Sequence, residues 1–484
     1  MPEKNKQTNI ARRNFLRTGA ASAAFLGSGF WTTDALRAAT IAEQARGEAR
    51  NVIFLVSDGM SSGTLTLADL MLRRRDGRVS NWMKLYERQN IRRGLMDMAS
   101  RNSVVTGSAA ASSSWGCGHR VNNGRVNWGE NDEEYTPILK YFRDAGKGTG
   151  LVTTTTITHA TPAGFSVNVP QRGMQETIAE QYLERRYDVL LGGGNLFYHK
   201  DLRSDGHDLY SDYKNADYHV VRKKGDLFNV PGDDKRLLGV FYDGHVPYTL
   251  DHINTQEYRE NIPTLAEMTQ IALNRLSKNR NGFIMQIEGG RVDHAAHSND
   301  VGGLIFDQIA FDDAIGVVVE FAEENPDTLV IVTTDHGNAN PGLNGQGSGY
   351  NDSNVHFDRI QEFKHTNNWV LAALSEESTI NQIRERIEEA TGIHITGKQA
   401  VALQDSYRGV YEAVYSMMNR PSQVLGQIMA NYTSVNWVGS AHTADYVELA
   451  AFGPGSETIG AFTKNTELFD VMTEAAGVEV EAGY

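Results

Sequence analysis

Six short runs of continuous apolar and β-branched residues, each ending abruptly in polar residues, constrain most strongly how this chain can fold. The runs cover residues 51–56, 150–154, 188–191, 282–287, 328–333 and 447–452. Continuous apolar character is typical of strands that are buried on both faces, as in a parallel sheet covered by helices. Helical patterns, such as 178–186 and 262–276, lie between these runs. The sequence therefore predicts a three-layer α/β/α fold with a central, mostly parallel sheet.

The stretch from about 342 to 437 has a different pattern. Ile380, Ile383, Ile387 and Ala390 repeat at helical spacing behind Thr379, a residue type that caps helices. Further helical pattern follows over 397–429. We expect a mainly helical insertion here rather than an independent domain. Its role is open: it could shape substrate access, form a dimer contact or tether the protein to a surface.

Composition and charge exclude several classes of protein. The chain has 40 % hydrophobic and 22 % charged residues, which indicates a globular protein rather than a disordered or multi-span membrane one. Lys and Arg number 46 against 60 Asp and Glu, a net charge of −14, which argues against a nucleic-acid-binding surface. The single cysteine, Cys117, excludes intrachain disulfides and is expected to be a small buried apolar residue. Fourteen histidines remain as candidate metal ligands.

The N-terminus is typical of an export signal. Arg12 and Arg13 precede an apolar pair and a weakly hydrophobic, small-residue run over 18–30, as in twin-arginine signals, with cleavage expected near Ala38 or Ala39. The alternative is a basic tail with a short amphipathic helix. The run is too short and glycine-rich for a membrane span. We therefore expect a signal peptide over 1–39 and a periplasmic or secreted protein without an integral membrane segment.

Potential metal ligands stand where the predicted strands end. Asp58 follows the first run, and Glu288, Asp293 and His297 follow the fourth. Asp335 and His336 follow the fifth run, and His442 stands just before the last. Ligands of open α/β sheets bind beyond the carboxyl ends of the strands. Singly, each residue could be a helix cap or a structural hydrogen-bonding group, but together these carboxylates and imidazoles suit one or two zinc ions.

A candidate nucleophile lies in the small-residue stretch 104–112. Ser108 could begin a helix there, where backbone N–H groups and the helix dipole favour an anion such as phosphate. The alternative is that Ser108 is only a helix cap. A second polar segment, 156–162, follows the run at 150–154 and supplies His159 and Thr161.

These motifs, taken together, resemble the alkaline phosphatase family in their order and spacing. The resemblance covers roughly residues 50–340 and 433–456, without the insertion, and rests on the segments 57–59, 107–110, 159–162, 288–297, 335–337 and 442–443. Because the motifs run from Asp58 to His442, most of the chain is needed for one site. We therefore expect one catalytic domain over 50–484, although 484 residues suggest about three domains by length.

The resemblance implies a ligand set for three metal ions. A first zinc would be held by Asp293, His297 and His442, and a second by Asp58, Asp335 and His336 together with Ser108. A third ion, usually magnesium, would take Asp58, Thr161 and Glu288. Arg172 stands where the family keeps its phosphate-binding arginine, and His159 and His294 would lie beside the third ion. Imidazoles at these two positions could change the affinity for magnesium or admit another metal.

The activity that the resemblance implies is the hydrolysis of small phosphomonoesters through a phosphoserine on Ser108, which releases inorganic phosphate and an alcohol. Dimerisation is common in the family, so a homodimer is one arrangement to test. One departure concerns Gly107, because the family commonly has an acidic residue there that helps to position the arginine. Arg172 is therefore expected to be held more loosely.

The sequence favours this activity over others of related chemistry. A sulfatase needs Cys or Ser in a C/S-x-P-x-R context, which the segment from Cys117 to Arg120 lacks. A metal-dependent phosphomutase is intracellular, which the export signal opposes. A phosphodiesterase would use the same metals, but Arg172 favours monoesters with their additional negative oxygen. A non-catalytic metal- or phosphate-binding protein would need no nucleophile.

Overall fold

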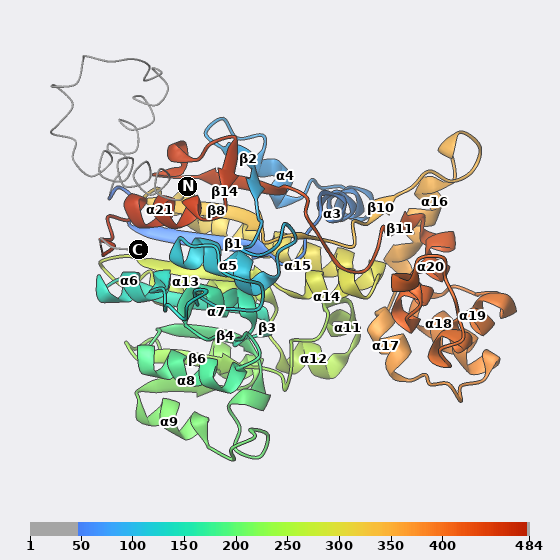
Figure 1. Ribbon diagram of the computed structural model, residues 1–484, viewed down its shortest axis with the longest axis horizontal. Coiled ribbons are helices and arrows are strands. Elements are labelled where there is room, and N and C mark those ends of the chain that lie inside the picture. The colour runs from blue at the N-terminus through green and yellow to red at the C-terminus, as the bar shows by residue number, and fades with distance from the viewer. Residues whose placement is uncertain (1–46, 482–484) are drawn as a thin grey trace.

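The central element of the structure is a ten-stranded sheet. The computed structural model describes residues 47–481, so the expected signal peptide lies outside the described residues. Figure 1 shows the sheet with helices on both sides. Its order is β14-β2-β13-β8-β1-β7-β3-β4-β6-β5, and it is mostly parallel, with β13 antiparallel to both its neighbours. The strands are β1 (Asn51–Ser57), β2 (Arg92–Asp97), β3 (Gly148–Thr156), β4 (Val189–Gly193), β5 (Tyr218–Val221), β6 (Arg236–Val240), β7 (Phe283–Gly289), β8 (Thr328–Thr334), β13 (Val447–Phe452) and β14 (Phe462–Lys464).

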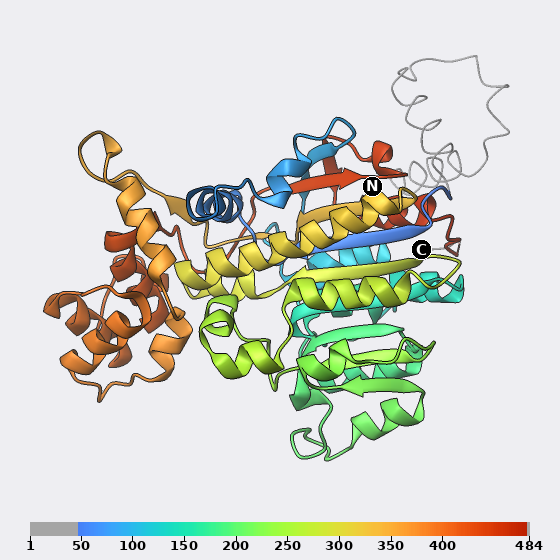
Figure 2. The ribbon, with the colours of Figure 1, turned by 180° about the vertical axis from the view of Figure 1, so that it is seen from behind.

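Alternate residues of the central strands enter two separate hydrophobic layers. On β1, Ile53 and Leu55 pack into one layer, whereas Phe54 and Val56 pack into the other. The first layer is covered by α3 (Ser62–Arg75), α13 (Leu265–Leu276) and α15 (Val301–Glu324), of which α13 and α15 lie in front in Figure 2. The second is covered by α5 (Ser108–Cys117), α6 (Ile138–Asp144), α7 (Ala160–Ser166), α8 (Gln175–Arg185) and α21 (Glu467–Ala475). The predicted three-layer α/β/α fold is confirmed.

All six predicted apolar runs are strands, while β2, β5, β6 and β14 were not predicted. β14 and β5, with three and four residues, are the shortest strands of this sheet and form its two edges. β2 begins with the exposed Arg92 and Arg93 and therefore lacks a continuous apolar run. The two edge strands are too short to show an apolar pattern in the sequence.

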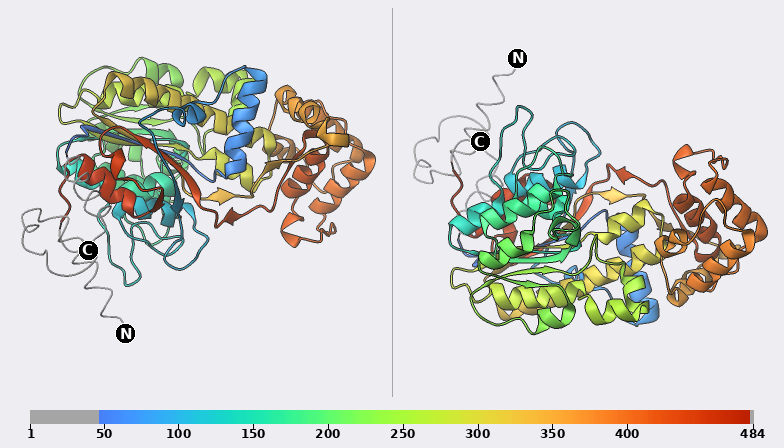
Figure 3. Two further views of the ribbon diagram at one scale, coloured as in Figure 1. Left: turned by 90° about the horizontal axis from the view of Figure 1, so that it is seen from above. Right: turned by 90° about the horizontal axis from the view of Figure 1, so that it is seen from below.

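The segment between residues 342 and 437 forms a group of helices at one end of the molecule (Figure 3). It contains α16 (Ser353–Asp358), α17 (Asn367–Ala372), α18 (Ile380–Thr391), α19 (Gly397–Tyr407) and α20 (Pro421–Thr433). A two-stranded antiparallel pair, β10 (Gly342–Leu343) with β11 (Val435–Asn436), closes its base. The Thr379 hydroxyl accepts from the Gln382 N–H and caps α18, in agreement with the sequence pattern. We propose that residues 342–437 are an insertion within one domain that covers residues 50–484.

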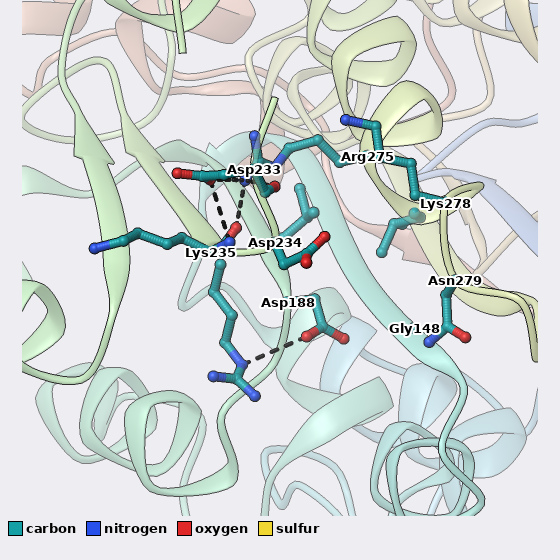
Figure 4. A pocket seen from close by; sticks show the side chains of 11 residues that line it. Gly148, Asp188, Asp233, Asp234, Lys235, Arg275, Lys278 and Asn279 are labelled. Atoms are coloured by element: carbon teal, nitrogen blue, oxygen red, sulfur yellow. Dashed lines mark hydrogen bonds and ion pairs between the residues drawn. The ribbon is translucent and has the colours of Figure 1, made fainter. Parts of the chain in front are cut away.

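A surface pocket of about 230 Å³ lies at the opposite end of the sheet from the strand ends discussed below (Figure 4). Its lining includes Gly148 and Val189, the first residues of β3 and β4. Two ion pairs lie in its lining: Arg236 with Asp188 at 3.4 Å and Arg275 with Asp233 at 3.7 Å. Parallel strands bind ligands at their carboxyl ends, so this pocket is not a candidate for the active site.

We predict that Asp307 makes the stability depend on pH. Asp307 on α15 is buried and accepts hydrogen bonds from the Thr249 N–H and hydroxyl, and burial raises the pKa of this carboxyl to about 7. Its contribution is present below the unfolded pKa of about 4 and is lost as the pH rises through about 7. Asp307→Asn keeps both contacts, because its amide can donate to the hydroxyl. Its free energy of unfolding relative to wild type should rise by on the order of 1–3 kcal/mol between about pH 5 and about pH 9.

Denaturant titrations at both pH values check this prediction. Asp234→Asn at an exposed position serves as the control and should show no such change. A difference between wild type and Asp307→Asn that does not change with pH would contradict it.

Candidate metal centre

Three carboxylates meet at the carboxyl ends of β1, β7 and β8. The register pairs Ser57 of β1 with Gly289 of β7 and with Thr334 of β8, which places Asp58, Glu288 and Asp335 at one edge of the sheet. All three side chains are fully buried. The turn after β1 brings in the Gly59 N–H, which donates to Asp335 Oδ1 at 2.9 Å. The sheet topology therefore gathers residues that are almost 300 positions apart in sequence.

The first group of potential ligands is Asp293, His297 and His442. Asp293 and His297 lie one turn apart on α14 (Arg291–His297), with 3.4 Å between Oδ2 and Nε2. β12 (His442–Thr443) pairs with β9 (Gly337–Asn338) and places His442 Nε2 3.6 Å from Asp293 Oδ1. The Nε2 atoms of the two histidines are 3.0 Å apart.

Backbone carbonyls orient both imidazoles of this first group. His297 Nδ1 donates to the Ser440 carbonyl at 2.8 Å, and His442 Nδ1 donates to the Thr106 carbonyl at 2.8 Å. In the neutral rings the two facing Nε2 atoms are then both unprotonated acceptors, so they cannot hydrogen-bond to each other. Two such lone pairs directed at one point suit a cation, and a hydrogen bond at the other ring nitrogen is typical of metal-binding histidines.

The second group is Asp58, Asp293 and His336, with Asp335 and Ser108 beside it. His336 Nε2 lies 3.2 Å from Asp335 Oδ2 and 3.6 Å from Asp58 Oδ1. The Ser108 hydroxyl, on the first residue of α5, is 3.4 Å from the same nitrogen. A buried hydroxyl therefore lies against a cluster of oxygen and nitrogen donors.

The third group is Asp58, His159 and Glu288. His159 Nδ1 lies 3.4 Å from Glu288 Oε1, and the Thr161 hydroxyl donates to Asp58 Oδ2 at 3.4 Å. The hydroxyls of Thr153 and Thr155 donate to Glu288 Oε2. Every metal-ligand position predicted from the sequence thus lies in one connected cluster, and Asp58 and Asp293 each belong to two of the three groups.

The electrostatics of this cluster fit bound cations. Asp58 Oδ1, Glu288 Oε1 and Asp335 Oδ2 are buried and accept no hydrogen bond from the described residues. Among residues 47–481 no Lys or Arg forms an ion pair with Asp58, Glu288, Asp293 or Asp335; only histidines do. Unpaired buried carboxylates are costly, and oxygen and imidazole donors in this combination suit zinc and magnesium.

The pKa values of Asp58 and Asp335 reflect their burial next to other negative charges. Burial, followed by the charges of Asp335 and Asp293, raises the pKa of Asp58 well above its usual value. Burial likewise raises the pKa of Asp335 to about 7. Burial also lowers the pKa of His336 well below its usual value, which keeps this imidazole neutral and able to bind a metal.

Arg172 lies beside the third group. Its Nη2 is 2.9 Å from His159 Nε2, so the predicted phosphate-binding side chain lies against the third group of potential metal ligands. Cys117 ends α5, and burial raises its thiol pKa to about 12, which agrees with a small buried apolar residue.

Sequence reasoning missed His245 and Asn338. The His245 ring packs 4.4 Å from the His294 ring and 5.7 Å from the His159 ring, and burial lowers its pKa to about 3. His245 lies in a loop after β6 with no motif to mark it. Asn338 donates to Asp293 Oδ1 at 2.7 Å and stands two residues after His336, which is the one signal that could have identified it.

Comparisons with known proteins show a family likeness over most of this chain. The family model described as alkaline phosphatase matches residues 49–478 and runs through the insertion, so the expectation that the likeness leaves out this segment is wrong. "Alkaline phosphatase 4" of Bacillus subtilis is 30 % identical over 90 % of this chain and 90 % of its own length. "Streptomycin-6-phosphate phosphatase" of Streptomyces griseus is 32 % identical over 65 % of this chain and 80 % of its own. The crystal structure of Thermus thermophilus alkaline phosphatase superposes with a TM-score of 0.84 at 33 % identity, and the match covers 94 % of this chain and 97 % of that one.

We predict that removal of metal destabilises the protein through repulsion among the buried carboxylates. Treatment with a chelator should lower the Tm by roughly 10 °C, and added zinc should restore it. Asp58→Asn removes the charge shared by two groups, so the stripped variant should lose less stability than the stripped wild type. Differential scanning calorimetry with metal analysis checks this. An equal loss of Tm in wild type and Asp58→Asn would contradict the repulsion argument.

Proposed function

The chain belongs to the alkaline phosphatase family of metal-dependent phosphomonoester hydrolases, and on this premise we propose that it acts through a phosphoserine formed on Ser108. One observation carries the proposal. The Ser108 hydroxyl is buried at the first residue of α5 and lies 3.4 Å from His336 Nε2, beside the cluster of potential metal ligands. A helix cap would need no such surroundings.

For the metals, we propose two zinc ions and one magnesium ion. Asp293, His297 and His442 would hold the first zinc, and Asp58, Asp335, His336 and Ser108 the second. Asp58, Thr161 and Glu288 would hold magnesium, with His159 and His294 beside it. When bound, such ions lower the pKa of a coordinated hydroxyl and neutralise charge on the attacking and leaving oxygens.

The proposed reaction has two steps at phosphorus. Ser108 Oγ gives up its proton to solvent and forms a bond to phosphorus, while the bond from phosphorus to the alcohol oxygen breaks and the alcohol leaves with a proton from solvent. Water then attacks the phosphorus of the phosphoserine and forms a new oxygen–phosphorus bond, while the bond from phosphorus to Ser108 Oγ breaks. Inorganic phosphate is released, and the serine hydroxyl takes up a proton. The backbone N–H groups at the start of α5 and the Arg172 guanidinium hold the phosphoryl oxygens. The guanidinium binds two of these oxygens at once.

We predict that Ser108→Ala lowers the turnover of p-nitrophenyl phosphate by at least about 10³-fold, because the nucleophile is removed. Acid quenching of the wild type with labelled substrate should trap phosphoserine, and the variant should trap none. Ser114→Ala on the same helix is the control, because that hydroxyl only donates within the helix to the Ala110 carbonyl.

The same assay separates the rival activities. Bis-p-nitrophenyl phosphate should react much more slowly than the monoester, and a chelator should abolish both reactions. Full monoesterase activity in metal-loaded Ser108→Ala would overturn the mechanism. Preference for the diester would indicate a phosphodiesterase.

Export through the twin-arginine route is also proposed, with a periplasmic or secreted location. Arg12 and Arg13 lie outside the described residues. Within residues 47–481 no helix is long and apolar enough to cross a membrane. Small phosphomonoesters are the proposed substrates, nucleic acids are not proposed as partners, and the homodimer is a further proposal by family resemblance.

We predict that residues 1–45 direct a folded reporter out of the cytoplasm and that Arg12→Lys with Arg13→Lys stops this export, because the receptor of the route reads the arginine pair. Fractionation of cells that carry the two fusions is the measurement. Export that the double change leaves unaffected would contradict the proposal.

A further inference from the structure

The guanidinium of Arg172 is held at a single point. Arg172 lies in the turn before α8, where its backbone N–H donates to the Gly124 carbonyl at 2.8 Å. Among the described residues no Asp or Glu pairs with it, and its one side-chain hydrogen bond runs from Nη2 to His159 Nε2 at 2.9 Å. An arginine whose guanidinium has no fixed partner must lose side-chain freedom each time it binds phosphate.

The His159 ring is a rigid anchor for this contact. It is 8 % exposed, and the rings of His245 and His294 pack edge-on against it at 5.7 Å. Arginine can only donate, so His159 Nε2 is the acceptor and the ring proton of the neutral imidazole lies on Nδ1. Nδ1 lies 3.4 Å from Glu288 Oε1 and 3.9 Å from Asp58 Oδ2. One neutral imidazole therefore stands between the guanidinium and the buried carboxylates.

Gly107, the residue before Ser108, supplies no side chain to this arginine, although there is room for one. Its backbone is extended, with φ −110° and ψ 160°, and an added Cβ would meet only Asn123 Oδ1, at 3.9 Å. The Gly107 N–H donates to Asn123, and the Arg172 N–H donates to Gly124. Two adjacent residues of one loop thus hold the backbones of Gly107 and Arg172 close together.

We propose that His159 is the positioning residue for Arg172: its Nε2 holds the guanidinium in the orientation that binds phosphate, in a site where residue 107 offers no carboxylate to do so. The inference rests on the proposed phosphatase function and deepens it. His159 acts through Arg172 and does not touch the substrate.

His159→Asn tests the proposal, because the asparagine amide can replace Nδ1 beside Glu288 but cannot reach the place of Nε2. The binding of inorganic phosphate to metal-loaded protein, measured by calorimetry, should weaken by about tenfold, the effect of one hydrogen bond to a charged group. The same change made in Arg172→Ala protein should weaken binding by less than about twofold, since the partner is already gone. Equal effects in both backgrounds would overturn the proposal.

Rescue from residue 107 gives a second readout. Gly107→Asp in the His159→Asn background should restore most of the phosphate affinity, because the new carboxylate can pair with Arg172. Gly107→Asn, of the same size but uncharged, is the matched control and should not restore it. Failure of Gly107→Asp to exceed this control would count against the proposal. Metal content is measured for every variant, and a fall in His159→Asn that matches its loss of affinity would assign His159 to metal binding instead.

The outcomes also separate this inference from the proposed function. If metal-loaded wild type neither hydrolyses monoesters nor binds phosphate, the function itself is wrong. If the wild type does both and Arg172→Ala weakens phosphate binding, but His159→Asn is additive with it, only the role of His159 is wrong.

Discussion

The convergence of four buried carboxylates, without a lysine or arginine partner among residues 47–481, is the constraint on which the rest of the structure depends. Asp58, Glu288, Asp293 and Asp335 lie in one cluster and pair only with histidines among the described residues. In a low-dielectric interior, such anions repel one another and cannot be compensated by water. Bound cations compensate this repulsion, so the free energy of metal binding contributes directly to the stability of the fold. The cluster therefore favours bound cations, because no Lys or Arg among the described residues neutralises these carboxylates.

A rigid sheet and backbone carbonyls hold this unfavourable arrangement together. The β1, β7 and β8 strands are fully buried, and their register fixes where Asp58, Glu288 and Asp335 begin. His297 and His442 are oriented by the carbonyls of Ser440 and Thr106, which are distant in sequence from the histidines they hold. The helical segment contributes as well, because Gln423 of α20 donates to the His297 carbonyl at 2.7 Å. A segment with no ligand of its own thus supports the first metal group.

The sequence predicts the parts of this arrangement that follow from topology. Strands buried on both faces are continuous in apolar character, and ligands at the carboxyl ends of neighbouring strands must meet. The central strands and the ligand cluster could therefore be predicted. Strands such as β2 and β14 could not be predicted, since exposed residues interrupt their pattern. His245 and the hydrogen bond from Arg172 to His159 were also beyond reach. They depend on how loops fold back over the sheet, and neither leaves a periodicity or a spacing in the chain.

The net charge of −14 does not oppose the binding of a phosphomonoester, because net charge and local field are separate quantities. Four of the acidic side chains are the buried carboxylates. Bound metal ions would neutralise their charge, and such ions do not enter a net charge counted from the sequence. Arg172 adds one fixed positive group at the edge of the same site. The neutral imidazole of His159 is the suitable link between the two, because a carboxylate in its place would add a further anion beside Glu288. A histidine there can accept from the arginine on one nitrogen and present an N–H toward Glu288 on the other.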